Sequence, residues 1–201
     1  MTAEPFLVLV LVLTVAILSP GPAIIAATQM ALSQGREKAW PFGLGLAFGA
    51  SLWCLFALFG MAAVFKLYPA LLQAAKLGGA LYLIYMAWGL WHGASAALPA
   101  AATRRFGNGF TGGVILCLSN PKPALFYSAL ILTLFPDAHG AGVIAAIYAT
   151  ALATELFWYS TVTLSMSTAV MRKRYLSAKF WIDRAAAVAL TALAALLVFE
   201  I

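Results

Sequence analysis

The sequence predicts an all-α integral membrane protein, a six-helix transmembrane bundle built as a 3+3 inverted repeat in which helices 1 and 4 are broken. Of its 201 residues, 64% are hydrophobic and only 9% are charged, and the mean hydropathy is +0.98. Soluble domains average about 25% charged residues. Several apolar segments reach the roughly 20 residues that cross a bilayer. Two similar proline-containing phrases, Leu18–Ala23 and Leu118–Ala124, interrupt the first and fourth segments.

The first half of the predicted repeat, about 1–95, contains three apolar segments. They run over Phe6–Leu32, Trp40–Phe65 and about 70–92. The first is long because it contains the interruption. In the second, Gly45 and Gly49 have the small-x-x-x-small spacing that lets helix backbones approach closely, so we expect a tightly packed inner helix.

The second half, about 105–201, also contains three segments. They run over Gly109–Phe135, Ala141–Val170 and Ala185–Ile201. The alanine-rich stretch 93–108 is the longest connection and the expected seam between the halves. We interpret residues 1–201 as a single transmembrane domain.

Basic residues gather in alternate connections, which predicts the orientation. They are Arg36 and Lys38, then Lys66 alone, then Arg104 and Arg105, then none, then Arg172, Lys173, Arg174, Lys179 and Arg184. The positive-inside rule makes the first, third and fifth connections cytoplasmic, so six crossings place both termini outside. Alternatively, the interruption makes the first segment re-entrant, which leaves five crossings and the N-terminus inside.

The formal charge of +6 belongs to this membrane topology rather than to a nucleic-acid surface. Enzyme signatures such as a His-Glu-x-x-His metal motif, a glycine-rich phosphate loop or a serine elbow are absent from the sequence. We therefore expect no enzyme, no nucleotide-driven pump and no cofactor.

The two interruptions indicate a binding site. Proline lacks an amide donor and clashes with the preceding turn, so the helix must open. An open backbone at membrane depth is tolerated only where it faces protein or a water-filled cavity. Three crossings per half insert the second half upside down, so the two breaks are expected to converge near the midplane, as they do at transporter binding sites.

Lys122, within the second interruption, is the strongest candidate for substrate binding. A charge at the bilayer centre costs at least about 2.5 kcal/mol, so it should face the bundle interior with a partner. We interpret it as the cation that holds a substrate carboxylate. The alternative is a structural ion pair with Glu155, the one acid that the pattern places deep in an apolar segment.

Glu155 itself has two interpretations of equal weight. A buried carboxyl group near a lysine could exchange a proton during transport and couple export to the proton gradient. Alternatively, it only neutralises Lys122.

Other polar residues near the breaks are weaker candidates. Ser19, Ser119, Asn120 and Gln29 offer hydroxyl and amide groups to a zwitterion, or they cap freed backbone groups. The amides of each new helix N-terminus suit a carboxylate. Lys76 lies about two turns into the third segment, where its long stem could also reach the interface by snorkelling.

Five phrases together resemble one family. They are Ser19-Pro20-Gly21-Pro22, Gly35-Arg36, Leu77–Leu83, Phe106–Phe110 and Asn120–Ala124. In order and spacing they resemble the lysine exporter (LysE/RhtB) family of bacterial amino-acid exporters, across nearly the whole chain. The resemblance implies an inner-membrane secondary transporter that exports amino acids such as threonine, homoserine, leucine, lysine or arginine at the expense of the proton gradient.

The resemblance also assigns positions. Ser19, Pro20, Gly21, Pro22, Asn120, Pro121 and Lys122 fall on motif positions of that family, and Lys76 on a typical lysine. Pro123 departs from the commoner Asn-Pro-Lys-Ala and predicts a sharper break.

Two other functions are less compatible with the sequence. A heavy-metal cation exporter would want His and Cys clusters, which this sequence does not supply. A membrane thiol-disulfide conduit would use Cys54 and Cys117, but we interpret both cysteines as small apolar side chains that fill space between packed helices. The interiors of the apolar segments contain one acid, Glu155, and two lysines, Lys76 and Lys122. Because a basic substrate would need a negatively charged site, this balance favours neutral or small hydroxylated substrates. Glycine pairs such as Gly45 and Gly49 suit helix contacts within one bundle or between two copies of the chain, so the sequence is compatible with a monomer and with a homo-oligomer.

Overall fold

The computed structural model of the chain describes residues 3–18, 21–67, 69–95, 107, 109–136 and 140–199. These residues form eight α-helices and no strand, so the predicted all-α class is confirmed. The helices are α1 (Glu4–Leu18), α2 (Pro22–Gln34), α3 (Arg36–Leu67), α4 (Pro69–Gly93), α5 (Gly109–Leu118), α6 (Pro121–Leu134), α7 (Ala141–Ser165) and α8 (Ala169–Phe199).

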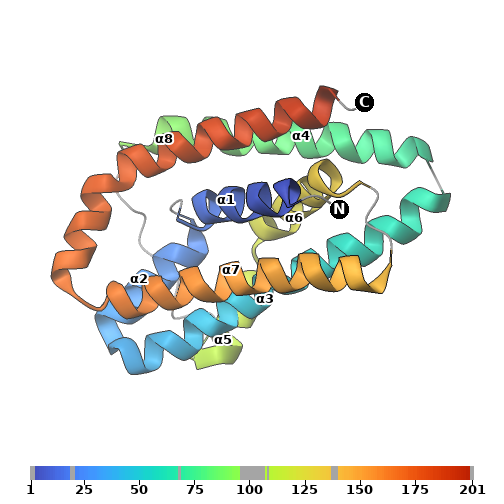
Figure 1. Cartoon of the computed structure of the whole chain (residues 1–201). Helices are drawn as coiled ribbons and strands as arrows, with labels where there is room; N and C mark the ends of the chain where they lie inside the picture. Colours follow the sequence, from blue (N-terminus) through green and yellow to red (C-terminus); the bar gives the residue numbers. More distant parts are fainter. Residues whose placement is uncertain are drawn as a thin grey trace.

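The long helices run along a common direction in two pairs, with short helices between them (Figure 1). On one side α3 packs against α7, and on the other α4 packs against α8. The short helices α1 and α6 lie between these pairs, and the two ends of the chain lie toward the same end of the bundle. The middle layer therefore contains one helix from each break, α1 from the first and α6 from the second.

Two helices are bent where the sequence predicts a break. The axes of α1 and α2 meet at 60°, and those of α5 and α6 at 65°. Among the described residues, two helices are long and apolar enough to cross a membrane, or four if each bent pair is one span. The described part of the chain thus confirms the broken helices, while six crossings in two inverted halves remain a prediction.

Helix α3 is tightly packed, as its glycines predict. A Cβ atom on Gly45 would collide with the Phe110 carbonyl oxygen, and one on Gly113 would collide with that of Phe42. A Cβ on Gly49 would lie 2.8 Å from Cβ of Cys117. The small residues therefore let α3 and α5 approach backbone to backbone, which fixes the helix that precedes the second break.

The last helix begins earlier than predicted. The sequence analysis placed a basic connection before a segment starting at Ala185, but α8 is helical from Ala169. Its first half is amphipathic, with Tyr175 and Lys179 buried while Lys173 and Trp181 are exposed. A search for continuous apolar runs misses such a helix, because only one stripe of it is buried.

Candidate functional site

The two breaks line one cavity of about 50 Å³. Described residues of the two breaks therefore come together as predicted, while their depth near the membrane midplane remains a prediction. The lining side chains come from α1, α2, α3, α6 and α7 and from the break residues themselves. They are Leu13, Ala16, Ile17, Gly21, Pro22, Ala23, Ile24, Ala50, Asn120, Lys122, Pro123, Phe126, Tyr127, Glu155 and Tyr159. Most of the wall is apolar, and a few polar groups are placed within it.

The second break is a capped helix start. Asn120 is the N-cap of α6, and its Oδ1 accepts a hydrogen bond of 3.1 Å from the backbone amide of Lys122. Pro121 takes the first helical position, where an amide donor would be unsatisfied anyway. Pro123 also lies in the first turn, where its missing amide removes no intrahelical hydrogen bond, and the sharper break expected from its departure from the family pattern remains a prediction.

A carbonyl freed by this break has protein partners. The Cys117 carbonyl accepts the Asn120 backbone amide at 3.2 Å and the indole nitrogen of Trp53 at 3.4 Å. This satisfies the requirement that no backbone group at a break be left facing lipid. Trp53, on α3, was not identified from the sequence.

The first break supplies space. Gly21 caps α2 in an extended conformation, and Pro22 follows at the first helical position. A Cβ atom on Gly21 would lie 3.1 Å from Nζ of Lys122. Because glycine has no side chain, the ammonium group can approach the backbone of the opposite break.

Lys122 therefore lies between the two breaks, as predicted. Its Nζ is 3.5 Å from the carbonyl oxygen of Ala16, the one hydrogen bond it makes among the described residues. The ammonium interacts electrostatically with the carboxylates of Asp183 and Glu155, yet no ion pair within 4.0 Å joins it to any described carboxylate. The direct ion pair with Glu155 that was weighed as the alternative is not present.

Glu155 is 3% exposed and lies on α7. Its Oε1 accepts a 2.7 Å hydrogen bond from the hydroxyl of Tyr127, while Oε2 has no partner among the described residues. The amide nitrogen Nδ2 of Asn120 is likewise buried and unpartnered. Buried polar atoms normally find partners, so an acceptor, an amide donor and a sparsely bonded ammonium in one cavity indicate a site for a polar ligand.

Two of the other predicted site residues, Ser119 and Gln29, are not brought to the cavity. Ser119 is exposed, and Gln29 is half-buried on α2 and absent from the lining. Ser19 and Pro20 lie outside the described residues, as do the side chains of Lys76 and Pro121.

Sequence reasoning missed several residues of the site. Tyr159 follows Glu155 by one helical turn, and Tyr127 follows Pro123 by one turn, so the 3.6-residue period could have found both. Outside the cavity lining it also missed Asp183, a second buried acid, on α8. Asp183 was overlooked because its segment was read as a connection.

The residues behind the alternative functions lie elsewhere. Cys54 and Cys117 are free thiols, each with 0% exposure in the core. Within the described ranges, no group of three or more histidine, cysteine or acidic residues is placed to hold a metal ion.

Comparison with known proteins identifies the family. The model of the LysE type translocator family matches residues 14–200. The chain belongs to this family. As a LysE type translocator it is a multi-pass membrane transporter and not an enzyme.

Named relatives of this LysE type translocator include efflux proteins. The chain is 29% identical over 184 residues to the threonine efflux protein of Escherichia coli (strain K12), covering 89% of each chain. It is also 29% identical over 147 residues to the leucine efflux protein of Salmonella choleraesuis (strain SC-B67), covering 71% of this chain and 69% of that protein. No solved structure matches it significantly.

Proposed function

We propose that this LysE type translocator is a secondary active transporter that exports amino acids across the bacterial inner membrane, coupled to the proton gradient. The observation that carries this function is the cavity between the two breaks, where Lys122, Asn120 and Glu155 present complementary polar groups within an apolar wall. The efflux proteins named among the relatives support the same substrate class.

The polar groups match the two ends of an amino-acid zwitterion. The Lys122 ammonium and Nδ2 of Asn120 are donors suited to the α-carboxylate, and the free Oε2 of Glu155 is an acceptor suited to the α-ammonium. Hydrogen bonds to charged groups contribute about 1.5–3 kcal/mol each. The groups of the site would thus be satisfied by the substrate itself.

The wall favours a neutral side chain. Beyond the polar groups the cavity is lined by small and apolar side chains such as Ala23, Ile24, Ala50 and Phe126. A lysine or arginine substrate would bring a second cation next to Lys122, with Glu155 as the only lining acid among the described residues. Small hydroxylated or neutral substrates such as threonine, homoserine or leucine are therefore preferred in this proposal.

The proposed topology has six crossings, formed by α1 with α2, by α3, by α4, by α5 with α6, by α7 and by α8. Helices α4 and α8 contain 25 and 31 residues, and 20 helical residues span about 30 Å. The two chain ends lie at the same end of the bundle, which supports an even number of crossings. By the positive-inside rule both termini are then periplasmic.

Glu155 is the proposed proton carrier. Its Oε2 can hold either a proton or the substrate ammonium, so the two would compete for one atom. Tyr127 keeps the carboxylate oriented in both states through its 2.7 Å hydrogen bond. Alternate occupation of this kind exchanges protons for substrate across the membrane.

The test is efflux of a panel of labelled amino acids from loaded cells, with and without a protonophore. We expect the wild type to export neutral amino acids and to stop when the gradient collapses. Glu155→Gln should lose the response to the gradient, because an amide cannot release a proton. Energy-independent efflux by the wild type would contradict the proton coupling, and export of none of the panel would contradict the substrate class.

A further inference from the structure

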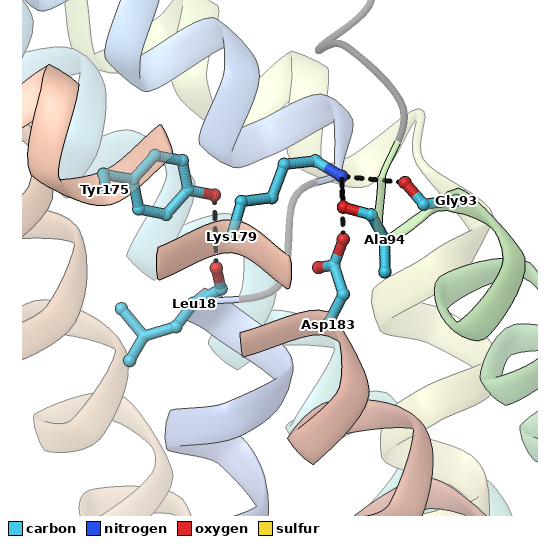
Figure 2. A network of polar contacts seen from close by, with 6 residues as sticks. All are labelled: Leu18, Gly93, Ala94, Tyr175, Lys179 and Asp183. Carbon is cyan, nitrogen blue, oxygen red and sulfur yellow. Dashed lines mark hydrogen bonds and ion pairs between the residues drawn. The ribbon is translucent and has the colours of Figure 1, made fainter. Parts of the chain in front are cut away.

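A second polar network lies outside the cavity and joins α8 to the ends of two other helices (Figure 2). Tyr175, Lys179 and Asp183 are spaced four residues apart, so they lie along one face of α8. All three side chains are buried. The cavity lining does not include them, and the proposed transport chemistry does not use them.

Lys179 is the centre of this network. Its Nζ donates to the carbonyl oxygens of Gly93 and Ala94 at 2.8 and 3.1 Å, and to Oδ2 of Asp183 at 2.9 Å. These partners use all three donors of the ammonium. The cation also lies at the C-terminal end of α4, where the helix dipole favours positive charge.

Tyr175 extends the network to the first break. Its hydroxyl donates a 3.3 Å hydrogen bond to the carbonyl of Leu18, the last residue of α1. Gly21, three residues later, lines the cavity. The face of α8 therefore holds the end of α1 and the end of α4 together beside the break (Figure 2).

The side of the membrane on which this network lies can be inferred from the arrangement of the helices. The first part of α8 crosses the end of the bundle opposite the two chain ends (Figure 1). The starts of α3 and α8 lie at that end (Figure 1), and these two helix starts contain the basic residues that the positive-inside rule makes cytoplasmic, Arg36, Lys38, Lys173 and Arg174. The network thus lies on the side from which an exporter loads its substrate.

An exporter must admit substrate to the cavity from one side of the membrane and release it on the other. The cavity of about 50 Å³ has room for a few ordered water molecules, each of which needs about 10–15 Å³ on the same measure. Part of the wall must therefore move during the transport cycle, and the end of α1 is the part that α8 holds.

The bonds are arranged so that opening is inexpensive. Lys179 and Asp183 belong to the same helix, so their ion pair survives if α8 moves away from α4 and α1. Only the hydrogen bonds to Leu18, Gly93 and Ala94 would be exchanged for water. No buried charge would lose its partner, which is the expensive event for an ion pair.

We propose that Tyr175, Lys179 and Asp183 form a cytoplasmic gate that holds the cavity closed and releases the end of α1 when substrate loads. The proposal rests on the proposed export, because it takes the cytoplasm as the loading side. It assigns the releasable contacts to Tyr175 and Lys179, whose hydrogen bonds reach α1 and α4, while the Lys179–Asp183 pair stays together on α8 in both states.

Thiol labelling of the cavity tests the gate. Ala23→Cys places a reporter on the cavity wall, in a background with Cys54→Ala and Cys117→Ala. A membrane-impermeant maleimide is applied to inverted vesicles, which expose the cytoplasmic face, and to right-side-out vesicles. Tyr175→Phe removes one hydroxyl and should raise the labelling rate about 2- to 10-fold in inverted vesicles only, the effect of one net hydrogen bond.

Tyr148→Phe is the matched control. It removes the hydroxyl that lies 3.4 Å from Oγ of Ser51, away from α8, and should leave labelling unchanged. Asp183→Asn weakens the ion pair that orients the Lys179 ammonium group toward the end of α4, so it should raise the rate in inverted vesicles as well. Equal labelling in the wild type and Tyr175→Phe, or an increase only in right-side-out vesicles, would overturn the gate.

The outcome is separable from that of the proposed function. Labelling reports accessibility and needs no transport. If the variants open the cavity but the wild type exports none of the amino acids, the gate stands and the substrate assignment fails. If export is found and labelling does not change, the gate fails alone.

Discussion

The break between α1 and α2 and the break between α5 and α6 have the same local construction, with a cap residue followed by proline at the first helical position. Their contributions to the cavity differ. The second break supplies the cation of Lys122 and the amide of Asn120, whereas the first supplies the open space at Gly21 and the carbonyl of Ala16. Two similar sequence phrases therefore have complementary roles. The second break supplies hydrogen-bond donors, and the first supplies the space and the carbonyl acceptor that accommodate them.

They also differ in how they are held. The second break follows α5, which is fixed to α3 by the glycine contacts of Gly45 and Gly113 and by the indole of Trp53. Helix α1, before the first break, contains no glycine. It packs through Leu9, Leu13 and Ile17 and accepts single side-chain hydrogen bonds at Thr14, Ala16 and Leu18. The first break is therefore the one expected to move.

Removing the cation of the second break should have the largest effect. Lys122→Met keeps a long apolar stem and deletes the ammonium, so the substrate carboxylate loses a charged partner worth about 1.5–3 kcal/mol. We expect efflux of labelled threonine at low internal concentration to fall about 10- to 100-fold. Gly60→Ala, at a glycine with open space around it, is the control. Wild-type efflux by Lys122→Met would contradict the donor role.

The two functions of Asn120 can be separated. Asn120→Asp keeps the cap oxygen and loses the amide donor, whereas Asn120→Ala loses both. Efflux should fall about tenfold in each, as expected for one hydrogen bond to a charged group. Only Asn120→Ala should also lower the melting temperature, by about 2–4 °C. Melting is measured in detergent, and equal melting temperatures for the two variants would remove the capping role.

These two predictions concern residues that the sequence analysis found, and the reason is physical. Prolines and a lysine in an apolar run conflict with lipid, so the conflict itself marks Lys122 and the breaks. The all-α class, the two bends and the close packing at Gly45 and Gly49 follow from similarly local patterns.

Other features depend on the arrangement of distant segments and leave little trace in the sequence. The contact of Trp53 with the Cys117 carbonyl and that of Tyr175 with Leu18 join residues far apart along the chain. Buried Asp183 lies in a stretch whose average hydropathy resembles a connection. Ser119 and Gln29 lie near the breaks in the sequence, but the exposed Ser119 in the turn after α5 and the half-buried Gln29 on α2 are both absent from the cavity lining.

The space that the first break leaves at Gly21 for the Lys122 ammonium group predicts a smaller effect on apparent affinity. Gly21→Ala would put a methyl group 3.1 Å from Nζ of Lys122, and the flexible side chain must shift. We expect about a fivefold loss of apparent affinity, equivalent to about 1 kcal/mol. In a Lys122→Met background the same substitution should have almost no effect, since no ammonium remains to displace. Additive losses in the double variant would mean that Gly21 and Lys122 act independently, which would contradict the space-providing role of Gly21.

The smallest effect is expected from the anchoring of the second break. Trp53→Phe removes one hydrogen bond of 3.4 Å to the Cys117 carbonyl, which still accepts the Asn120 amide. Efflux should change less than about twofold, in line with a net hydrogen bond of about 0.5 kcal/mol. A loss as large as that of Lys122→Met would mean that the indole takes part in transport.

Binding of a ligand without its carboxylate charge tests the cavity most directly. Purified protein in lipid nanodiscs is titrated with threonine and with threonine amide, for the wild type and Lys122→Met. We predict that the wild type binds threonine at least about tenfold more tightly than the amide, and that Lys122→Met binds both equally weakly. If Lys122→Met retained the wild-type preference for threonine, the carboxylate would be recognised elsewhere and the site between the two breaks would be refuted.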